Sequence, residues 1–152
     1  MSRRPRSKTV TAWLAFAGGP LGLWRFYLRG LGDWIGWAVW IPTLLGAYGC
    51  VRIQQYGVDD VASWFLVPLL GLTIAATSLV AIVYGLMTPE KWNASFNPRE
   101  PSDAPAGNSQ WLTIFAIVAA LMVGTGCLMA TLAFSFFNYF NAQVEEGRRI
   151  SE

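Results

Sequence analysis

The chain has 152 residues, 54% of them hydrophobic and 13% charged, with a net charge of +2. A soluble domain usually carries about twice this fraction of charged residues. The apolar residues come in long blocks with few charges, which is typical of membrane-spanning helices. The composition therefore disfavours a soluble domain. It predicts an all-α fold, a polytopic membrane helical bundle in contact with the lipid bilayer, with about four hydrophobic segments.

Residues 1–8 form a basic flank that contains Arg3, Arg4, Arg6 and Lys8. A flank this short is a poor surface for nucleic acid, so we expect no nucleic-acid partner. Attraction to anionic lipid on the cytoplasmic side explains these charges better. A cleaved signal peptide is also disfavoured, because the apolar core at 10–14 is shorter than the usual minimum of about seven residues.

The first apolar segment, 9–24, is short and interrupted. A helix needs roughly 17 to 25 residues to cross the hydrocarbon, and this segment is just below that range. It contains Gly18-Gly19-Pro20, where the proline lacks a backbone N–H and its ring clashes with the preceding turn. We expect the helix to break there. The segment either crosses with help from a snorkelling Arg25, or enters the membrane and returns.

Three longer helices are predicted over most of 34–51, 61–87 and 111–137. The second and third of these segments contain no charge and are long enough to cross with tilt. Pro42 should bend the first, and Asp59 or Asp60 should cap the start of the second.

The connection at 88–110 is polar and rich in proline, and Thr88 should cap a short helix at its start. Residues 99–109 are expected to be disordered. The chain thus divides into a basic flank, a two-transmembrane-like hairpin, a third membrane helix, a polar loop, and a fourth membrane helix with a polar tail: 1–8, 9–58, 59–87, 88–110 and 111–152.

Small residues recur at four-residue spacing on the last two membrane helices, including Ala81 and Gly85 on one and Ala120 and Gly124 on the other. Such stripes allow helices to approach closely, and close contact drives helix association in lipid. We therefore expect these four residues to face protein and to pack the two helices together.

The polar hinge between the first two segments reads Arg25-Phe26-Tyr27-Leu28, followed by Arg29 and Asp33. Charged residues so close to hydrocarbon are costly and usually have partners. A structural hinge is favoured, in which Arg25 pairs with Asp33 or lipid phosphate while Phe26 and Tyr27 lie at headgroup depth. The alternative is an ion or substrate gate beside a broken helix.

This hinge resembles that of the two-transmembrane domain family. The family has a basic Lys/Ser start, a glycine-rich first helix, a hinge reading Gly-x-His (or Asp)-Arg-Phe-Tyr-Leu-Gly, and a second helix. The similarity covers about residues 7–52 and includes Ser7-Lys8, Gly18-Gly19 and Gly22. Trp24 stands where the family has His or Asp, and Arg29 where it has Gly. The resemblance implies a membrane protein without a defined reaction.

Little in the sequence points to chemistry. The chain has no histidine, which excludes Ser/His/Asp and Cys/His sets. Its two cysteines, Cys50 and Cys127, lie in or beside apolar blocks and lack metal-ligand spacing. No charged residue lies deep in the third or fourth segment, where an ion pathway would need one. We therefore expect no enzymatic activity and no catalytic, cofactor-binding or metal-binding residue.

The basic residues indicate an N-terminus in the cytoplasm, with seven on that side against four if the first segment crosses, or eight against three if it returns. The expected location is the inner (plasma) membrane of a bacterium. We interpret the protein as a structural or interaction subunit of a membrane assembly, with a membrane-protein partner. The alternative is an oligomeric pore or small-solute transporter, lined by the broken first segment and formed by a homo-oligomer.

Overall fold

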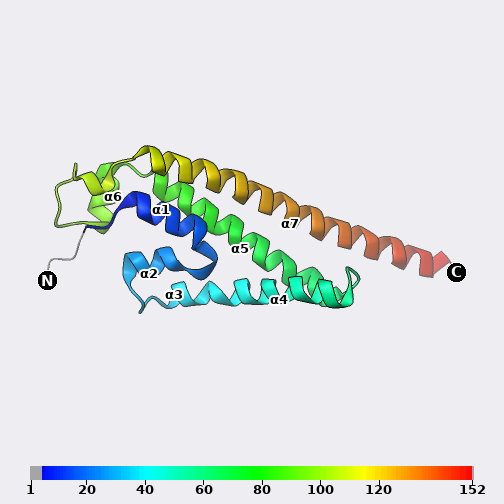
Figure 1. Ribbon diagram of the computed structural model, residues 1–152. Coiled ribbons are helices and arrows are strands. Elements are labelled where there is room, and N and C mark those ends of the chain that lie inside the picture. The colour runs from blue at the N-terminus through cyan, green and yellow to red at the C-terminus, as the bar shows by residue number, and fades with distance from the viewer. Residues whose placement is uncertain (1–4, 152) are drawn as a thin grey trace.

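The computed structural model of the chain describes residues 5–151, and its regular elements are all helices (Figure 1). The all-α class predicted from the composition is confirmed. In chain order the α-helices and the two 3₁₀ turns (η) are α1 Lys8–Ala17, η1 Gly19–Leu21, α2 Leu23–Arg29, α3 Trp34–Ala38, α4 Trp40–Tyr56, α5 Val61–Leu86, α6 Pro89–Phe96, η2 Pro105–Gly107 and α7 Trp111–Ser151.

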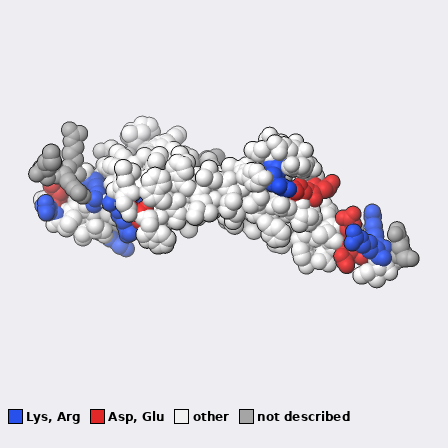
Figure 2. Space-filling view, turned by 90° about the horizontal axis from the view of Figure 1, so that it is seen from below, with Lys and Arg blue, Asp and Glu red and all other residues white. Residues whose placement is uncertain are grey.

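Within residues 5–151, three helical stretches are long and apolar enough to cross a membrane: Trp34–Tyr56, Val61–Leu86 and the apolar part of α7. The helices predicted over 34–51, 61–87 and 111–137 are therefore present. They run alongside one another (Figure 1), and Figure 2 shows an uncharged middle with charged side chains toward both ends. The end that holds the start of α1, the hinge and the loop 88–110 is called the hinge end, and the opposite end is called the tail end.

The first apolar segment is not one of these three stretches. At about 1.5 Å per residue, α1 is about 15 Å long, half of the roughly 30 Å of hydrocarbon. The chain then turns at η1, and α2 runs back beside α1 to the hinge end (Figure 1). The reversal of the chain fits the second of the two alternatives left open by the sequence, the return.

Glycine and proline produce this reversal. Pro20 cannot donate a backbone hydrogen bond, and α1 ends before it at Gly18. Gly22 then has a φ of +64°, a backbone conformation that residues with a Cβ atom adopt only with strain. A Cβ atom at Gly22 would also collide with the carbonyl oxygen of Gly36, so α3 lies directly against the turn.

The reversal leaves backbone carbonyls outside regular helix, and α4 supplies donors for them. The Thr43 hydroxyl donates to the carbonyl of Pro20 at 2.7 Å, and the Trp40 indole N–H donates to the carbonyl of Leu21 at 2.9 Å. Unpaired backbone groups are costly in an apolar environment. These two bonds therefore stabilise an irregular turn among apolar helices.

Pro42 was expected to bend the second segment, but the structure has a break instead, and the break lies before the proline. Since Pro42 has no N–H for the carbonyl of Ala38 four residues earlier, the helix breaks at Val39 into α3 and α4. Thr88 caps α6 through the backbone N–H of Lys91, as predicted.

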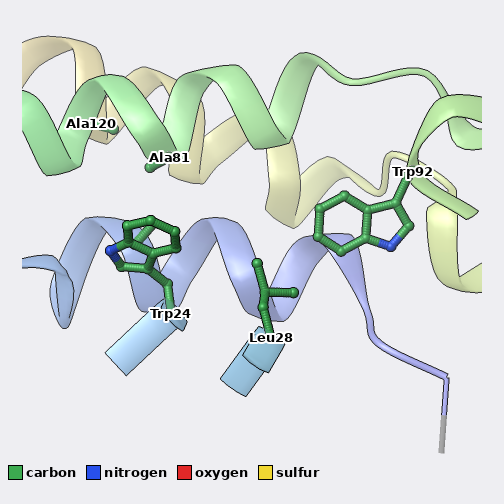
Figure 3. Packing of buried hydrophobic residues seen from close by; sticks show 6 residues of the cluster. Trp24, Leu28, Ala81, Trp92 and Ala120 are labelled. Atoms are coloured by element: carbon green, nitrogen blue, oxygen red, sulfur yellow. The ribbon is translucent and has the colours of Figure 1, made fainter. Parts of the chain in front are cut away.

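The buried core lies toward the hinge end, where α1 and α2 pack on α5, α6 and α7. Figure 3 shows Trp24 and Leu28 of α2 beside α1, with Ala81 of α5 nearby and Trp92 of α6 at the start of α1. Ala15 and Ala120 complete this cluster. Small residues where α1, α5 and α7 meet leave room for the large rings.

Two sequence-based expectations are wrong at this end. Lys8 is not part of a lipid-contacting flank: its side chain is 0% exposed, and its ammonium donates to the Met87 carbonyl at 2.8 Å and to Ser109 Oγ at 2.7 Å. Burial lowers the pKa of Lys8, and the nearby charge of Glu90 opposes that shift. The backbone N–H of Arg6 donates to Asn97 of the α6 segment, and Arg3 and Arg4, the rest of that prediction, lie outside the described residues.

The loop expected to be disordered is folded onto α6. The Asn93 amide donates to the carbonyls of Ser102 and Ala104, both at 3.0 Å, and is itself 1% exposed. A proline-rich, polar composition indicated disorder, but one buried amide with two backbone acceptors holds the segment in place.

Gly22→Ala tests the reversal. We expect it to lower the free energy of unfolding by about 1 to 3 kcal/mol, because alanine would adopt a left-handed conformation and collide with Gly36. Gly32→Ala is the control, since a Cβ there meets nothing within 4 Å. Unfolding of the two purified variants in detergent would be compared. Equal stability would contradict the packing of α3 against the turn.

Candidate functional site

The hinge is organised around an ion pair. Arg25 Nη1 donates to Asp33 Oδ2 at 2.9 Å, so the last turns of α2 are joined to the residue that caps α3. Asp33 Oδ1 also accepts from the backbone N–H of Ile35 at 3.2 Å. The hydrogen bond from Arg25 lowers the pKa of Asp33, although desolvation opposes it. The carboxylate is thus ionised at neutral pH, and it accepts hydrogen bonds from both α2 and α3.

The apolar hinge residues point to three different places. The Phe26 ring lies 5.1 Å from the ring of Trp37 and covers Gly36, where a Cβ would approach it within 2.5 Å. The Tyr27 hydroxyl accepts from the backbone N–H of Ser7 at 3.0 Å. Leu28 is 3% exposed and belongs to the buried core. Each of these three side chains therefore contacts protein.

Arg29 is exposed, and within residues 5–151 it belongs to neither of the two ion pairs. The structure thus joins Arg25 to Asp33 and leaves Arg29 outside the ion pair, although the charge of Arg29 also contributes to the lowered pKa of Asp33. This arrangement favours a structural hinge over a gate.

The same turn is built a second time at the tail end. Arg52 binds Asp60 through two hydrogen bonds of 2.8 and 2.7 Å, and Asp60 caps α5 by accepting from the backbone N–H of Ser63. The bonds from Arg52 are the main reason that the pKa of Asp60 is far below its usual value. Asp60, rather than Asp59, is the predicted cap.

The two turns agree residue by residue in the pattern Arg-x4-Gly-(Leu/Val)-x-Asp-x3-Trp. In each, the glycine has a positive φ, +90° at Gly30 and +86° at Gly57. In each, the tryptophan indole donates back to the carbonyl after that glycine, from Trp37 to Leu31 and from Trp64 to Val58. The repeat is visible in the sequence but was missed there. Because the second copy is an ordinary helix connection, the repeat favours a structural role for the first.

The predicted small-residue stripes lie in the contact between α5 and α7. Ala81 and Ala120 are 0% exposed, and Gly85 and Gly124 are also buried. A Cβ at Gly85 would lie 2.6 Å from Ile117 Cγ1, and a Cβ at Gly124 would lie 2.6 Å from Ser78 Cβ. The absence of side chains at these two glycines is what lets the helices approach.

An open groove borders this contact. Its volume is about 340 Å³, and its lining is almost wholly apolar, with Ser78 and Gly124 between the rims formed by Leu72, Leu79 and Leu128. The Ser78 hydroxyl is buried and has no hydrogen-bond partner. The shape and apolar lining of the groove therefore suit an apolar helix or acyl chain. Ser78, which also lines the groove, has a hydroxyl without a hydrogen-bond partner.

The role of α6 was also missed from the sequence. Trp92 is 0% exposed and donates to the Arg6 carbonyl at 2.9 Å, while Asn97 accepts from the Arg6 N–H at 2.7 Å. The signal was the pairing of Trp92 with Phe96 and of Asn93 with Asn97, each one helical turn apart, in a segment classified as a loop.

Within the described residues, no three His, Cys, Asp or Glu side chains are grouped in a way that could hold a metal ion. Comparisons with known protein families, with curated proteins and with solved structures found no match to this chain.

Gly124→Leu tests the helix contact. We expect a loss of about 1 to 3 kcal/mol in the free energy of unfolding, as is typical of overpacking. Gly126→Leu is a matched control on the same helix, because a Cβ there meets nothing within 4 Å. The two variants would be unfolded in parallel in detergent. If Gly126→Leu were the more damaging, α7 would pack through its other face.

Arg25→Ala tests the hinge. It would leave Asp33 charged without its partner, and we expect the amount of protein in the membrane to fall severalfold, as a modest loss of stability can cause. Arg52→Ala should act alike because it breaks the second copy of the turn, whereas Arg29→Ala should not. Quantitative blotting of membranes measures this. Normal abundance of Arg25→Ala with a clean loss of transport would show a gate instead.

Proposed function

We propose that this chain is a structural or interaction subunit of a membrane assembly and has no enzymatic activity. The proposal starts from the three candidate spans, which imply contact with a lipid bilayer. The observation that carries the proposal is the groove between α5 and α7, which combines small residues, apolar rims and the unpartnered hydroxyl of Ser78.

The groove fits a transmembrane helix of another protein. Helices associate in lipid through close van der Waals contact and interhelical hydrogen bonds, because the surrounding acyl chains are as apolar as leucine. Ala76 and Thr125 line the groove with small side chains, and rotation of the Ser78 side chain would let its buried hydroxyl donate to a polar group on the incoming helix. A partner helix would thus gain both kinds of contact.

The proposed orientation places the hinge end in the cytoplasm of a bacterium, with the protein in the inner (plasma) membrane. Among the described residues, the hinge end carries six basic residues and the tail end three: Arg6, Lys8, Arg25, Arg29, Lys91 and Arg99, against Arg52, Arg148 and Arg149. An excess of Lys and Arg is typical of the cytoplasmic side.

We also propose that about residues 7–52 are a divergent version of the two-transmembrane domain. The paired Arg25 and Asp33 support this, since they give the family-like hinge a definite structure. The first helix departs from a spanning helix, because α1 is short and α2 reverses.

A pore lined by the first segment is less well supported. The buried face of α1 contains Thr11, Ala12 and Ala15 and packs on protein. Its outer face presents Val10, which is 44% exposed, together with the partly exposed Trp13 and Phe16. An apolar outer face suits lipid rather than an aqueous path.

Filling the groove tests the proposal. A photo-crosslinking residue at Leu79 should join the protein to a different membrane protein at a constant ratio. Ala76→Phe should reduce that product at least severalfold, because the added ring occupies the groove without entering the α5–α7 contact. Ala62→Phe, an exposed change on α5 outside the groove, should leave it unchanged.

The alternatives give different results in the same experiment. Crosslinks joining only copies of this chain, with solute flux in liposomes, would favour the oligomeric pore. Crosslinks to lipid alone, with no protein product, would contradict an interaction role for the groove.

A further inference from the structure

A second hollow lies at the tail end, where α7 runs past the start of α5. It is a cleft of about 490 Å³ with a mixed polar and apolar lining. Asp59 and Trp64 line it on one side, and Phe137, Asn138 and Glu145 of α7 line it on the other. Figure 2 shows charged side chains gathered toward this end of the molecule, beyond the uncharged middle.

Asn138 is the unusual residue in this cleft. It is 4% exposed, and its amide Nδ2 is buried with no hydrogen-bond partner. A buried polar group without a partner is destabilising and calls for a specific explanation. Leucine at this position would fill similar space without the loss. Asn138 lines the cleft, so rotation of its side-chain amide would present Nδ2 to an acceptor held there.

The charge of the cleft is negative. Among the described residues the ion pairs are Arg25–Asp33 and Arg52–Asp60, so Asp59 and Glu145 belong to neither. Asp60, next in sequence to Asp59, is already neutralised by Arg52. The two free carboxylates attract a cation, and the aromatic rings of Trp64 and Phe137 can contact one favourably.

We propose that this cleft binds a primary ammonium group that carries a hydrogen-bond-accepting oxygen, which is the chemistry of an ethanolamine. Asp59 and Glu145 accept from the ammonium, and the Asn138 amide donates to the oxygen. The ligand is held as one cation between two carboxylates, and the buried amide gains its missing partner. Two sources carry this chemistry, the headgroup of an aminophospholipid and a soluble amine.

The position of the cleft is compatible with either source. Val58 and Val61, which line it, lie at the start of the Val61–Leu86 span, so the cleft is at the depth of lipid headgroups and also open to water. The purified full chain would be tested in detergent in two arms. Native mass spectrometry would compare retained phosphatidylethanolamine, phosphatidylcholine and phosphatidylglycerol, and thermal unfolding would be followed during titration with ethanolamine.

Retention of phosphatidylethanolamine at least tenfold above the other two lipids supports the site and identifies the lipid source. A rise in the unfolding temperature with ethanolamine, without lipid selectivity, supports the site and identifies the soluble source. Failure of both arms overturns the proposal. Phosphatidylcholine is the informative comparison, since its quaternary ammonium has no N–H to donate.

Variants connect the binding to the cleft. Asp59→Asn combined with Glu145→Gln should weaken binding at least tenfold, and Asn138→Leu should weaken it without lowering the unfolding temperature of the ligand-free protein. Glu146→Gln, adjacent to the cleft residue but outside its lining, should bind like the original chain. Equal binding by all of these variants would overturn the assignment. If Asn138→Leu did not fold, the carboxylate variant would still decide.

Discussion

The pairing of an arginine near the end of one helix with the aspartate that caps the next determines how this chain is arranged. The pair occurs at Arg25–Asp33 and again at Arg52–Asp60, on both sides of the Trp34–Tyr56 span. In each turn a glycine with positive φ ends the first helix, and the aspartate both caps the second helix and binds the arginine. Since the charges neutralise each other where water is scarce, each reversal can lie close to the hydrocarbon.

These two turns place the remaining elements. The first brings α3 against the reversal at Gly22, and the second sets α5 antiparallel to α4. Close approach of α5 and α7 at Gly85 and Gly124 then produces a surface on which the short α1 lies, joined by the 2.7 Å hydrogen bond between the hydroxyls of Thr9 and Thr113. The stability of the first segment therefore depends on packing rather than on its own length.

The sequence was sufficient wherever one local rule decided the outcome. Charge-free blocks predicted the three long helices, Gly18-Gly19-Pro20 predicted a break, and spacing predicted the contact between Arg25 and Asp33. It failed where partners lie far apart along the chain. Lys8 contacts Met87 and Ser109 only after α1 has folded onto the loop. From the sequence, its charge indicated a flank in contact with lipid, whereas in the structure its ammonium donates to two oxygen atoms in a buried environment. The groove and the cleft likewise exist only between helices.

Buried polar atoms without a partner occur toward both ends of the molecule, but only some of them border an open space. Toward the hinge end, the buried Lys8, Asn93 and Asn97 all have partners. Along α5 and α7, Ser78 and Asn138 do not, and each borders an open space. Trp24 Nε1 and Arg25 Nε also lack partners, but neither residue lines the groove or the cleft.

Unpaired polar groups beside accessible volume are where an added molecule gains the most, because it supplies bonds that the free protein lacks. The resemblance to a known hinge draws attention to Arg25-Phe26-Tyr27-Leu28, where the ion pair of Arg25 and the contacts of Phe26 and Tyr27 are made within the chain, although Arg25 Nε has no partner. The unsatisfied groups on α5 and α7 are the basis on which we propose recognition there. The hinge stabilises the fold, whereas Ser78 and Asn138 on α5 and α7 are polar residues without hydrogen-bond partners beside open spaces.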